Sequence, residues 1–524
     1  MRGLAVVRPP AAFLCDTTVP VTVWVSPPLT PVATRPTMCG TTTPHDDVTR
    51  TDATKSAGDD VTRRVEAMML TKTARRKAAP AGAAAVLALA LTACAGAGGG
   101  GNDDSAAGDG GPVELTLATV NNPQMKDMEE LKSAFEEDHP DITVNFIQME
   151  ENDLRDAVTK DVATDGGQYD IVTVGSYEVP IWAENGWLTD LTGDLESDAG
   201  YDVDDLFGPV KDALTVDGSL YAVPFYGESS MLMYNKEILD EAGITMPEHP
   251  TWQEVADIAR EVDSDDVDGI CLRGKPGWGE VFAPLTTVVQ TFGGTWFDED
   301  WNAQVDSPEF TEAVQFYVDL VGDAGEADPV STGFTECLNN VSQGRSAMWV
   351  DATVAAGLLE DPESSQVAGK MGYAHAPVVE TEESGWLWSW NLAIPETTQN
   401  RDAAVEFVKW ATSKEYHQLV GTELGWSRVP PGARTSTYEI PEYEEAAAAF
   451  APITRDIMLA VNPEQPGVAP QPWTGIQYVT IPEFQDLGNQ VSQDLADVFA
   501  GRSELDPVLD RAQDRAQQAG DAQK

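Results

Sequence analysis

Apolar and polar positions alternate over the first part of the folded body so that strands and helices are predicted in turn. VELTLATV (113–120) and ITVNFIQM (142–149) show the two-residue period of strands, and YDIVTVG (169–175) is a short apolar run typical of a buried strand. Two stretches with helical spacing, beginning near Met125 and Leu154, separate these strands. The alternation predicts a parallel sheet covered by helices, in which ligands gather beyond the carboxyl ends of the strands.

A second run of similar units begins after Leu239. The spacing of apolar residues predicts helices over 252–262, 310–321 and 403–411, and a strand over 269–274. A chain of 524 residues is longer than one hydrophobic core usually organises. The sequence therefore predicts an α/β protein of two lobes, with the chain passing between them.

Tryptophans are concentrated beside glycine and polar residues, and GWLWSWNLAIP (385–395) is the densest example. Trp386, Trp388 and Trp390 occupy alternate positions and would share one face of a strand. Indole faces match the C–H faces of a sugar or polyol, while carboxylates, arginine and asparagine satisfy its hydroxyls. The pattern favours a carbohydrate pocket, although packing in the core is the alternative for each tryptophan.

Three charged residues are candidates for hydrogen bonds to the hydroxyls of a ligand. Glu228 and Asp351 stand beside aromatic residues at predicted strand ends, and Arg273 follows an apolar segment. The guanidinium of Arg273 could span two hydroxyls or pair with one of these carboxylates.

Charge and motifs exclude several classes of function. The 32 Lys and Arg against 87 Asp and Glu give a net charge of −55, which repels phosphate backbones and anionic headgroups, so no nucleic-acid partner is expected. The chain has no Walker loop, G-x-S-x-G elbow or H-E-x-x-H motif. Its five histidines, His45, His139, His249, His375 and His417, lack the spacing of metal ligands, so neither a metal site nor a cofactor is expected.

The N-terminal part resembles an export signal rather than a fold. Residues 68–93 combine basic residues, an apolar run at 78–91 and a small-residue cleavage site, and LTAC ending at Cys94 resembles the lipobox of bacterial lipoproteins. Residues 94–112 form a Gly/Ala/Asp tether. Residues 1–67 have no place before such a signal. We expect a lipid-anchored protein on the extracellular face of the membrane.

The cysteines leave one pair in the exported body. Cys15 and Cys39 lie in the leader and Cys94 is the predicted lipidation site, which leaves Cys271 and Cys337. In an oxidising compartment these two can form a disulfide, but two buried free thiols explain them equally well.

Several long motifs, in order along residues 113 to about 500, resemble one family. The lipobox, the tether and these motifs are similar to the extracellular solute-binding lipoproteins of ABC importers, in particular the sorbitol/mannitol type that binds polyols. The motifs are ATVNNPQM (118–125), GQYDIVTVGSYEVPIW (167–182), AVPFYGESSMLMYNKE (222–237), GICLRGKPGWGE (269–280), MWVDATVAA (348–356), WLWSWNLAIP (386–395), ELGWSRVPPGART (423–435) and GIQYVTIPEFQDLG (475–488).

The resemblance implies a Venus-flytrap fold, in which two lobes joined by hinge strands close on one ligand. The implied hinge crossings lie near Phe225, Leu387 and Pro441. The implied lobes are 113–224 with 388–440, and 225–387 with 441–524. A polyol or small sugar would be captured between the lobes and delivered to permease subunits by a monomeric, membrane-anchored protein.

Matching motif positions imply a set of ligand contacts. They are Asn121, Asn122, Tyr177, Glu178, Tyr226, Glu228, Arg273, Trp278, Asp351, Trp388, Trp390 and Trp426. Because the second crossing falls inside 385–395, Trp386 is expected on the far side as packing, and Trp388 and Trp390 are expected to face the cleft.

Two other functions use similar residues. A cell-surface glycoside hydrolase would need tryptophans and two carboxylates about 5 to 10 Å apart, roles that Glu228 and Asp351 could take. A carbohydrate-sensing lipoprotein without transport is the other alternative.

Overall fold

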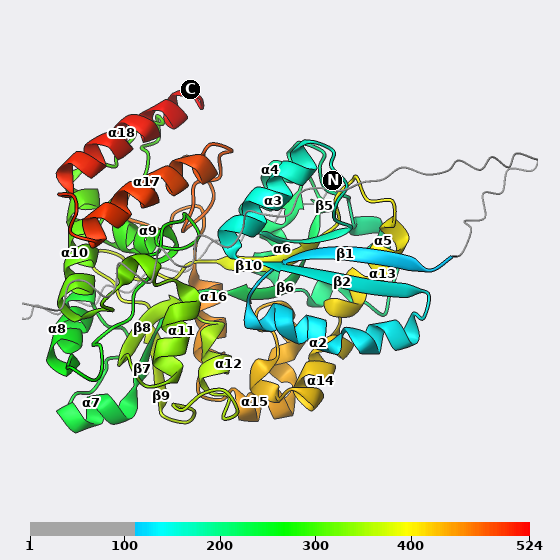
Figure 1. Cartoon of the computed structure of the whole chain (residues 1–524), viewed down its shortest axis with the longest axis horizontal. Helices are drawn as coiled ribbons and strands as arrows, with labels where there is room; N and C mark the ends of the chain where they lie inside the picture. The colour runs from blue at the N-terminus through cyan, green and yellow to red at the C-terminus, as the bar shows by residue number, and fades with distance from the viewer. Residues whose placement is uncertain (1–110) are drawn as a thin grey trace, which may run out of the picture. The chain divides into compact units, whose positions relative to one another are not determined.

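A five-stranded and a three-stranded β-sheet organise the computed structural model, which describes residues 111–524 (Figure 1). The predicted leader, signal peptide, lipidation site at Cys94 and nearly all of the tether lie outside the described residues. Among residues 111–524, no helix combines the length and the apolar character needed to cross a bilayer.

The first sheet has five strands and defines what we call the first lobe. β1 pairs in parallel with β2 and β3, as the alternating pattern predicts, while β10 joins β3 and β6 in antiparallel fashion. In order across the sheet, the strands are β2 (Ile142–Met149), β1 (Val113–Val120), β3 (Ile171–Gly175), β10 (Trp388–Ala393) and β6 (Ala222–Glu228).

Helices cover both faces of the first sheet. α3 and α4 contact its strands from one side and α2 from the other (Figure 1). The helices of this lobe are α2 (Pro123–Asp138), α3 (Glu151–Ala163), α4 (Glu178–Glu184), α5 (Thr192–Glu196), α6 (Gly208–Ala213), α13 (Arg401–Ala411) and α14 (Lys414–Glu423). A short hairpin of β4 (Thr215–Val216) and β5 (Ser219–Leu220) precedes β6.

The second sheet has three antiparallel strands and defines the second lobe. β7 (Ser230–Asn235) lies between β8 (Met348–Ala352) and β9 (Met371–His375). The helices around it are α7 (Lys236–Ala242), α8 (Trp252–Val262), α9 (Phe282–Thr291), α10 (Pro308–Ala324), α11 (Phe334–Ser342), α12 (Ala355–Leu359), α17 (Phe484–Phe499) and α18 (Asp506–Asp521). The parallel pattern of the first lobe is therefore not repeated here.

The predicted strand over 269–274 is wrong. This segment runs beside β8 but makes only isolated parallel bridges, at Asp268 to Ser346 and at Cys271 to Trp349. The α-carbon of Gly269 lies so close to the backbone of Ala259 in α8 that a β-carbon would not fit between them. The segment is held by close packing of backbones rather than by a continuous ladder.

The chain passes between the lobes in extended conformation. β6 ends at Glu228 and β7 begins at Ser230, so only Ser229 separates a strand of the first sheet from a strand of the second. The return from β9 enters β10 at Trp388. After α14, the helices α15 (Pro441–Ala446) and α16 (Ala451–Ala460) lead back, and α16 contacts β9 of the second sheet.

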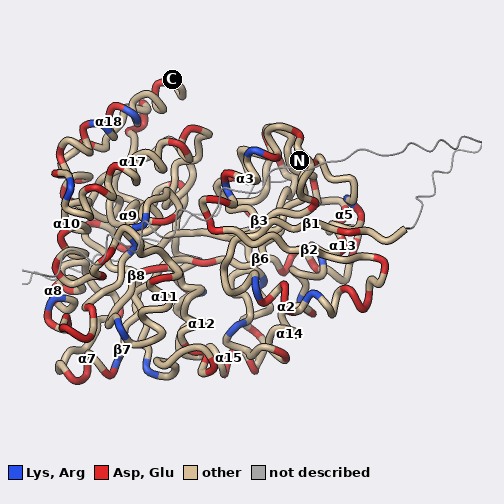
Figure 2. Tube along the Cα trace, in the orientation of Figure 1, with Lys and Arg blue, Asp and Glu red and all other residues tan. Residues whose placement is uncertain are grey.

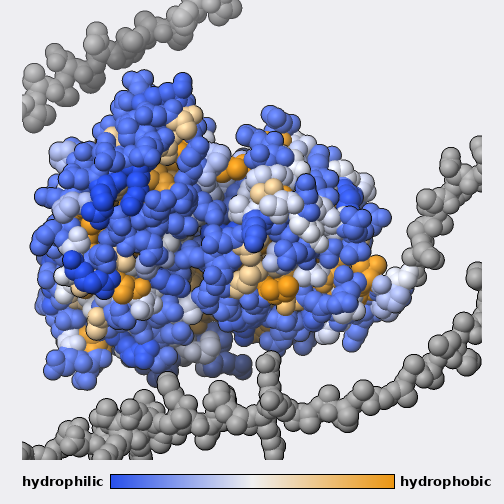
Figure 3. All heavy atoms as spheres, turned by 45° about the horizontal axis from the view of Figure 1, so that its top comes forward, coloured by the Kyte–Doolittle hydropathy of each residue, from blue (hydrophilic) through white to orange (hydrophobic). Residues whose placement is uncertain are grey.

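The described surface is strongly acidic and has no large apolar area on the face shown. Asp and Glu recur around both lobes and outnumber Lys and Arg (Figure 2). The space-filling view shows small, separate apolar patches on a hydrophilic surface (Figure 3).

Candidate ligand-binding site

A cavity lies where the two sheets meet. Its walls come from α3 and β10 of the first lobe, from the end of β6, and from the loop before α9 and the first residue of α11 in the second lobe. The predicted contacts Asn122, Tyr226, Glu228, Arg273, Trp278, Trp388 and Trp390 all line it.

Strand pairing brings the polar and aromatic parts of the cavity together. In the β10–β6 register, Trp388 lies opposite Glu228 and Trp390 lies opposite Tyr226. Because side chains two residues apart share a face, one side of this strand pair presents two indoles, a phenol and a carboxylate. The Asn122 amide, at the start of α2, donates to the Tyr226 hydroxyl at 2.8 Å.

Three indoles form one wall of the cavity. The rings of Trp388 and Trp390 meet edge to face with centroids 5.7 Å apart, and Trp278 of the second lobe meets Trp388 at 5.9 Å. A β-carbon on Gly175 in β3 would collide with the Trp388 ring and lie 2.7 Å from a carboxylate oxygen of Glu178. The absence of a side chain at Gly175 therefore leaves the space that the Trp388 ring occupies.

Arg155 on α3 is a cavity residue that the sequence did not single out. Its guanidinium carbon lies 4.1 Å from the Trp278 ring centroid, 5.2 Å from that of Trp388 and 5.1 Å from that of Trp390. Glu178 also pairs with this guanidinium. Three indoles around one buried cation make a cation–π cluster, which fixes the position of the aromatic wall.

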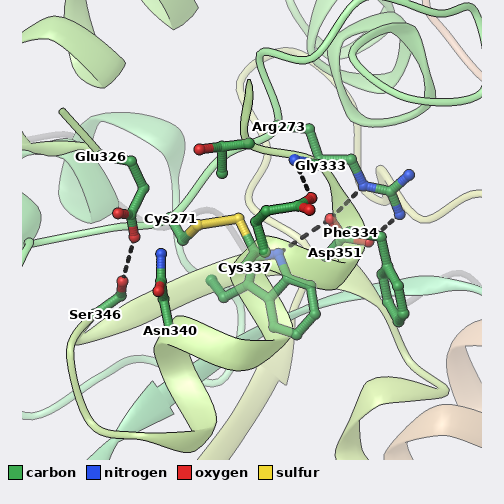
Figure 4. Close-up of a disulfide and its surroundings, with 12 residues drawn as sticks. Cys271, Arg273, Glu326, Gly333, Phe334, Cys337, Asn340, Ser346 and Asp351 are labelled. Atoms are coloured by element: carbon green, nitrogen blue, oxygen red, sulfur yellow. Dashed lines mark hydrogen bonds and ion pairs between the residues drawn. A yellow bond between two sulfur atoms is a disulfide. The ribbon is translucent and has the colours of Figure 1, made fainter. Parts of the chain in front are cut away.

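Arg273 is a cavity residue held by a buried ion pair. Its Nε donates to Oδ2 of Asp351 at 2.7 Å and its Nη2 to Oδ1 at 2.5 Å (Figure 4). Its Nη1 donates to the carbonyl of Gly279 at 3.0 Å. Burial lowers the pKa of Arg273, but attraction to Asp351 more than reverses this and holds the pKa above its usual value. The guanidinium is thus charged and fixed in orientation.

The bonded pair Cys271 and Cys337 supports the same wall. The two α-carbons lie 5.6 Å apart, and the disulfide joins the segment that carries Arg273 to α11, whose first residue Phe334 lines the cavity (Figure 4). The guanidinium carbon of Arg273 lies 5.3 Å from the Phe334 ring centroid. The disulfide thus connects two segments that shape the site.

Glu228 is a buried carboxyl at the cavity. Burial raises its pKa well above the usual value, and attraction to Arg273 opposes this only in part, while repulsion from Asp351 adds to it. A carboxyl held neutral can donate a hydrogen bond as well as accept one, which suits a ligand hydroxyl.

Five predicted contacts do not line the cavity. Asp351 and Glu178 lie behind it and act through Arg273 and Arg155. The remaining three make other contacts: Asn121 donates to Glu150, the Tyr177 hydroxyl donates to the carbonyl of Ile481 at 2.8 Å, and the Trp426 ring lies against Gly421 of α14.

Trp386 was expected to be packing away from the cleft, and this expectation is wrong. Trp386 lines the cavity together with Trp388 and Trp390. β10 begins only at Trp388, so Trp386 belongs to the crossing segment and does not follow the alternation of the strand.

Contacts between the lobes lie at one side of the cavity. The Asn152 amide of α3 donates to the carbonyl of Pro276 at 3.2 Å, and Lys275 lies 3.6 Å from a carboxylate oxygen of Glu150. Gly279 lies so close to a carboxylate oxygen of Glu151 that a β-carbon there would force this side chain to shift. The segment 275–280 and the start of α3 therefore close one side of the cavity.

Two histidines that are far apart in the sequence meet outside this cavity. His249 precedes α8 and His375 ends β9, and their ring centroids lie 3.9 Å apart beside Glu383. This contact arises from the tertiary fold and not from local spacing in the sequence.

The chain is similar to proteins of one family along most of the described residues. The family described as bacterial extracellular solute-binding protein matches residues 120–418. A mannitol-binding protein of Pseudomonas aeruginosa is 44% identical over 406 residues, which are 77% of this chain and 92% of that protein.

Two solved structures have the same architecture. An ABC transporter solute-binding protein from Agrobacterium vitis S4 with bound D-mannitol is 46% identical, with a TM-score of 0.77 over 78% of this chain and 99% of its own. A solute-binding protein from Agrobacterium radiobacter K84 in complex with ribitol, 24% identical, shares the fold with a TM-score of 0.70 over 78% and 99% of the two chains.

Proposed function

The chain belongs to the bacterial extracellular solute-binding proteins, and on that premise we propose that it captures a linear polyol or a small sugar between its lobes and delivers it to the permease of an ABC importer. A hexitol of the mannitol and sorbitol type is the ligand class that we favour. The relatives support this class, because one is named a mannitol-binding protein and the two solved structures hold D-mannitol and ribitol.

The observation that carries the proposal is the combination of groups around the cavity. Three indoles offer apolar faces, while fixed Arg273 and buried Glu228 offer groups that donate and accept hydrogen bonds. Among residues 111–524, the indole N–H of Trp278 and the amide oxygen of Gln477 are buried there without a hydrogen-bond partner. Each such group costs about 1 to 3 kcal/mol, which a ligand hydroxyl recovers.

Binding proceeds without covalent chemistry in this proposal. The ligand first meets one lobe, and closure then brings Trp278 and Arg273 of the second lobe against Trp388 and Trp390 of the first. The closed state gains population only by its higher affinity for the ligand. A ligand that lacks one hydroxyl leaves a buried group unpaired, so the site discriminates between polyols.

The hydrolase alternative is disfavoured by the environment of Asp351. Both of its carboxylate oxygens accept hydrogen bonds, from Arg273, from the Trp349 indole and from the backbone N–H of Ala352. A carboxylate engaged in this way is not free to attack a glycosidic carbon or to activate water. We therefore propose that the protein is not an enzyme.

The remaining parts of the proposal concern location and partners. The predicted lipid anchor at Cys94 would hold a monomer at the extracellular face of the membrane, where it meets permease subunits. Measuring the uptake of labelled polyol in cells that lack this protein separates the two functions. Uptake is lost if the protein serves transport, and it continues if the protein is only a sensor.

A thermal-shift panel tests the ligand class. D-mannitol, D-sorbitol, ribitol, erythritol and maltose are added to the purified protein, and a ligand at one hundred times its dissociation constant adds about 2.7 kcal/mol to the stability of the folded state. We expect a hexitol to raise the melting temperature most. If no alditol raises it and maltose does, the polyol assignment is wrong.

A further inference from the structure

We infer that His249, His375 and Glu383 form a binding site for one divalent transition-metal ion of the zinc type, separate from the polyol cavity. One ligand atom from each of the three residues lies within 4.8 Å of the others. None of the three lines the cavity. Two imidazoles with one carboxylate are a donor set that suits Zn²⁺ and not the hard cations Mg²⁺ and Ca²⁺.

The distance between two of the donors already fits a shared ion. Nδ1 of His375 lies 3.2 Å from Oε2 of Glu383. Two ligands about 2.1 Å from a tetrahedral Zn²⁺ are about 3.4 Å apart, so these atoms need little movement to bind one ion. An exposed side chain such as His249 can rotate to bring its nitrogen nearer.

The backbone holds the three residues in place without a metal. The N–H of His375 donates to the carbonyl of Glu248 at 3.0 Å, and the N–H of Val378 donates to the carbonyl of Pro250 at 3.1 Å. These two bonds fix the neighbours of His249 against the end of β9. The Ser384 hydroxyl donates to the carbonyl of Pro377 at 2.6 Å and so returns the chain beside His375.

The two imidazole rings lie against each other. Their ring planes are inclined by 31° with centroids 3.9 Å apart. A neutral imidazole carries the lone pair that a metal ion needs.

An ion can reach the site and is attracted to it. His249 is exposed, and the side chains of His375 and Glu383 are 14% and 34% exposed, which leaves room for water as a fourth ligand. Glu248, Glu380 and Glu382 are exposed neighbours in the sequence. Their negative charges raise the local concentration of cations.

The site lies at a mechanically important place. Glu383 belongs to the segment that runs from β9 to Trp386 and then into β10. An ion shared by Glu383, His375 and His249 would fasten the start of this crossing segment to the second lobe. The metal would thus act as a local cross-link near the hinge and would take no part in chemistry.

A zinc titration of the untagged, chelator-treated full chain tests the inference, with a chromophoric chelator as competitor. We expect one equivalent of Zn²⁺ to bind, and His249→Ala and Glu383→Gln each to weaken this binding by at least about ten-fold. His139→Ala, which removes a histidine far from the cluster in sequence, is the matched control. It should bind Zn²⁺ with the affinity of the wild-type protein. An excess of Mg²⁺ should not displace the ion.

The variants also separate loss of the site from loss of the fold. His249 is exposed, so His249→Ala should keep the melting temperature of the metal-free protein but should lose the rise caused by Zn²⁺. The inference is overturned if the unchanged protein binds no Zn²⁺. It is equally overturned if His249→Ala and Glu383→Gln bind Zn²⁺ as tightly as the unchanged chain, because the ion then sits elsewhere.

Discussion

The buried pair of Arg273 and Asp351 allows one prediction to be worked out in detail, with Asp351→Asn as the perturbation. Each carboxylate oxygen accepts two hydrogen bonds: Oδ1 from Nη2 of Arg273 and the N–H of Ala352, and Oδ2 from Nε of Arg273 and the indole of Trp349. An asparagine replaces one oxygen by an NH₂ group. Whichever way the amide turns, two buried donors lose their acceptor.

The cost follows from these contacts. Two unpaired donors at about 1 to 3 kcal/mol each, one of them on a buried cation, agree with the 3 to 5 kcal/mol typical of a broken buried ion pair. Arg273 also loses its fixed orientation at the cavity. If one charge-assisted hydrogen bond to the ligand is lost, at about 1.5 to 3 kcal/mol, the affinity for D-mannitol falls by about ten- to a hundred-fold.

A second buried ion pair, outside the cavity, provides the control. Asp205 accepts from Nη1 of fully buried Arg434 at 3.2 Å, and neither residue lines the cavity. Asp205→Asn should lower the free energy of unfolding in urea but leave the calorimetric affinity for D-mannitol unchanged. Asp351→Asn should lower both. Unchanged affinity in Asp351→Asn, or equal losses of affinity in the two variants, would refute the role assigned to Arg273.

Three further predictions concern the cavity and its supports. Gly175→Ala should force the Trp388 ring to move, at a cost of about 1 to 3 kcal/mol, and should weaken polyol binding in a calorimetric titration, whereas Gly322→Ala, where a β-carbon meets open space, should do neither. Because Glu228 has a raised pKa in the folded state, it binds more protons there than in the unfolded chain, so stability should fall as pH rises from about 4.5 towards the raised pKa. Glu228→Gln should remove this part of the fall, and identical melting profiles from pH 4 to 8 for both proteins would contradict the assignment. Cys271→Ser opens a loop that spans 66 residues, which predicts a loss of about 4 kcal/mol in urea unfolding; an unchanged midpoint would show that the disulfide does not constrain the chain.

The sequence predicts the first lobe well because its signals are local. The bounds expected for the strands over 113–120 and 142–149 are those of β1 and β2. The helix expected over 252–262 is α8, which Thr251 and Glu254 begin with a capping box. By contrast, the segment 269–274 is apolar like a strand but lies where β8 offers only isolated bridges.

The site could be predicted where it depends on strand alternation. Tyr226 and Glu228 on β6 face the same side as Trp388 and Trp390 on β10, and both pairs stand out in the sequence. Arg155 could not be found in this way, because its contacts with Trp388 and Trp390 depend on how α3 packs on β10, and its contact with Trp278 depends on how the two lobes meet. Local motifs also cannot reveal a contact between His249 and His375.

A calorimetric titration of D-mannitol into the purified protein tests the central claim most directly. The account predicts saturable binding of one molecule per chain, strongly reduced in Trp390→Ala, whose ring contributes to the aromatic wall, while that variant stays folded. Absence of heat with D-mannitol and with D-sorbitol, from protein that unfolds cooperatively, would contradict it.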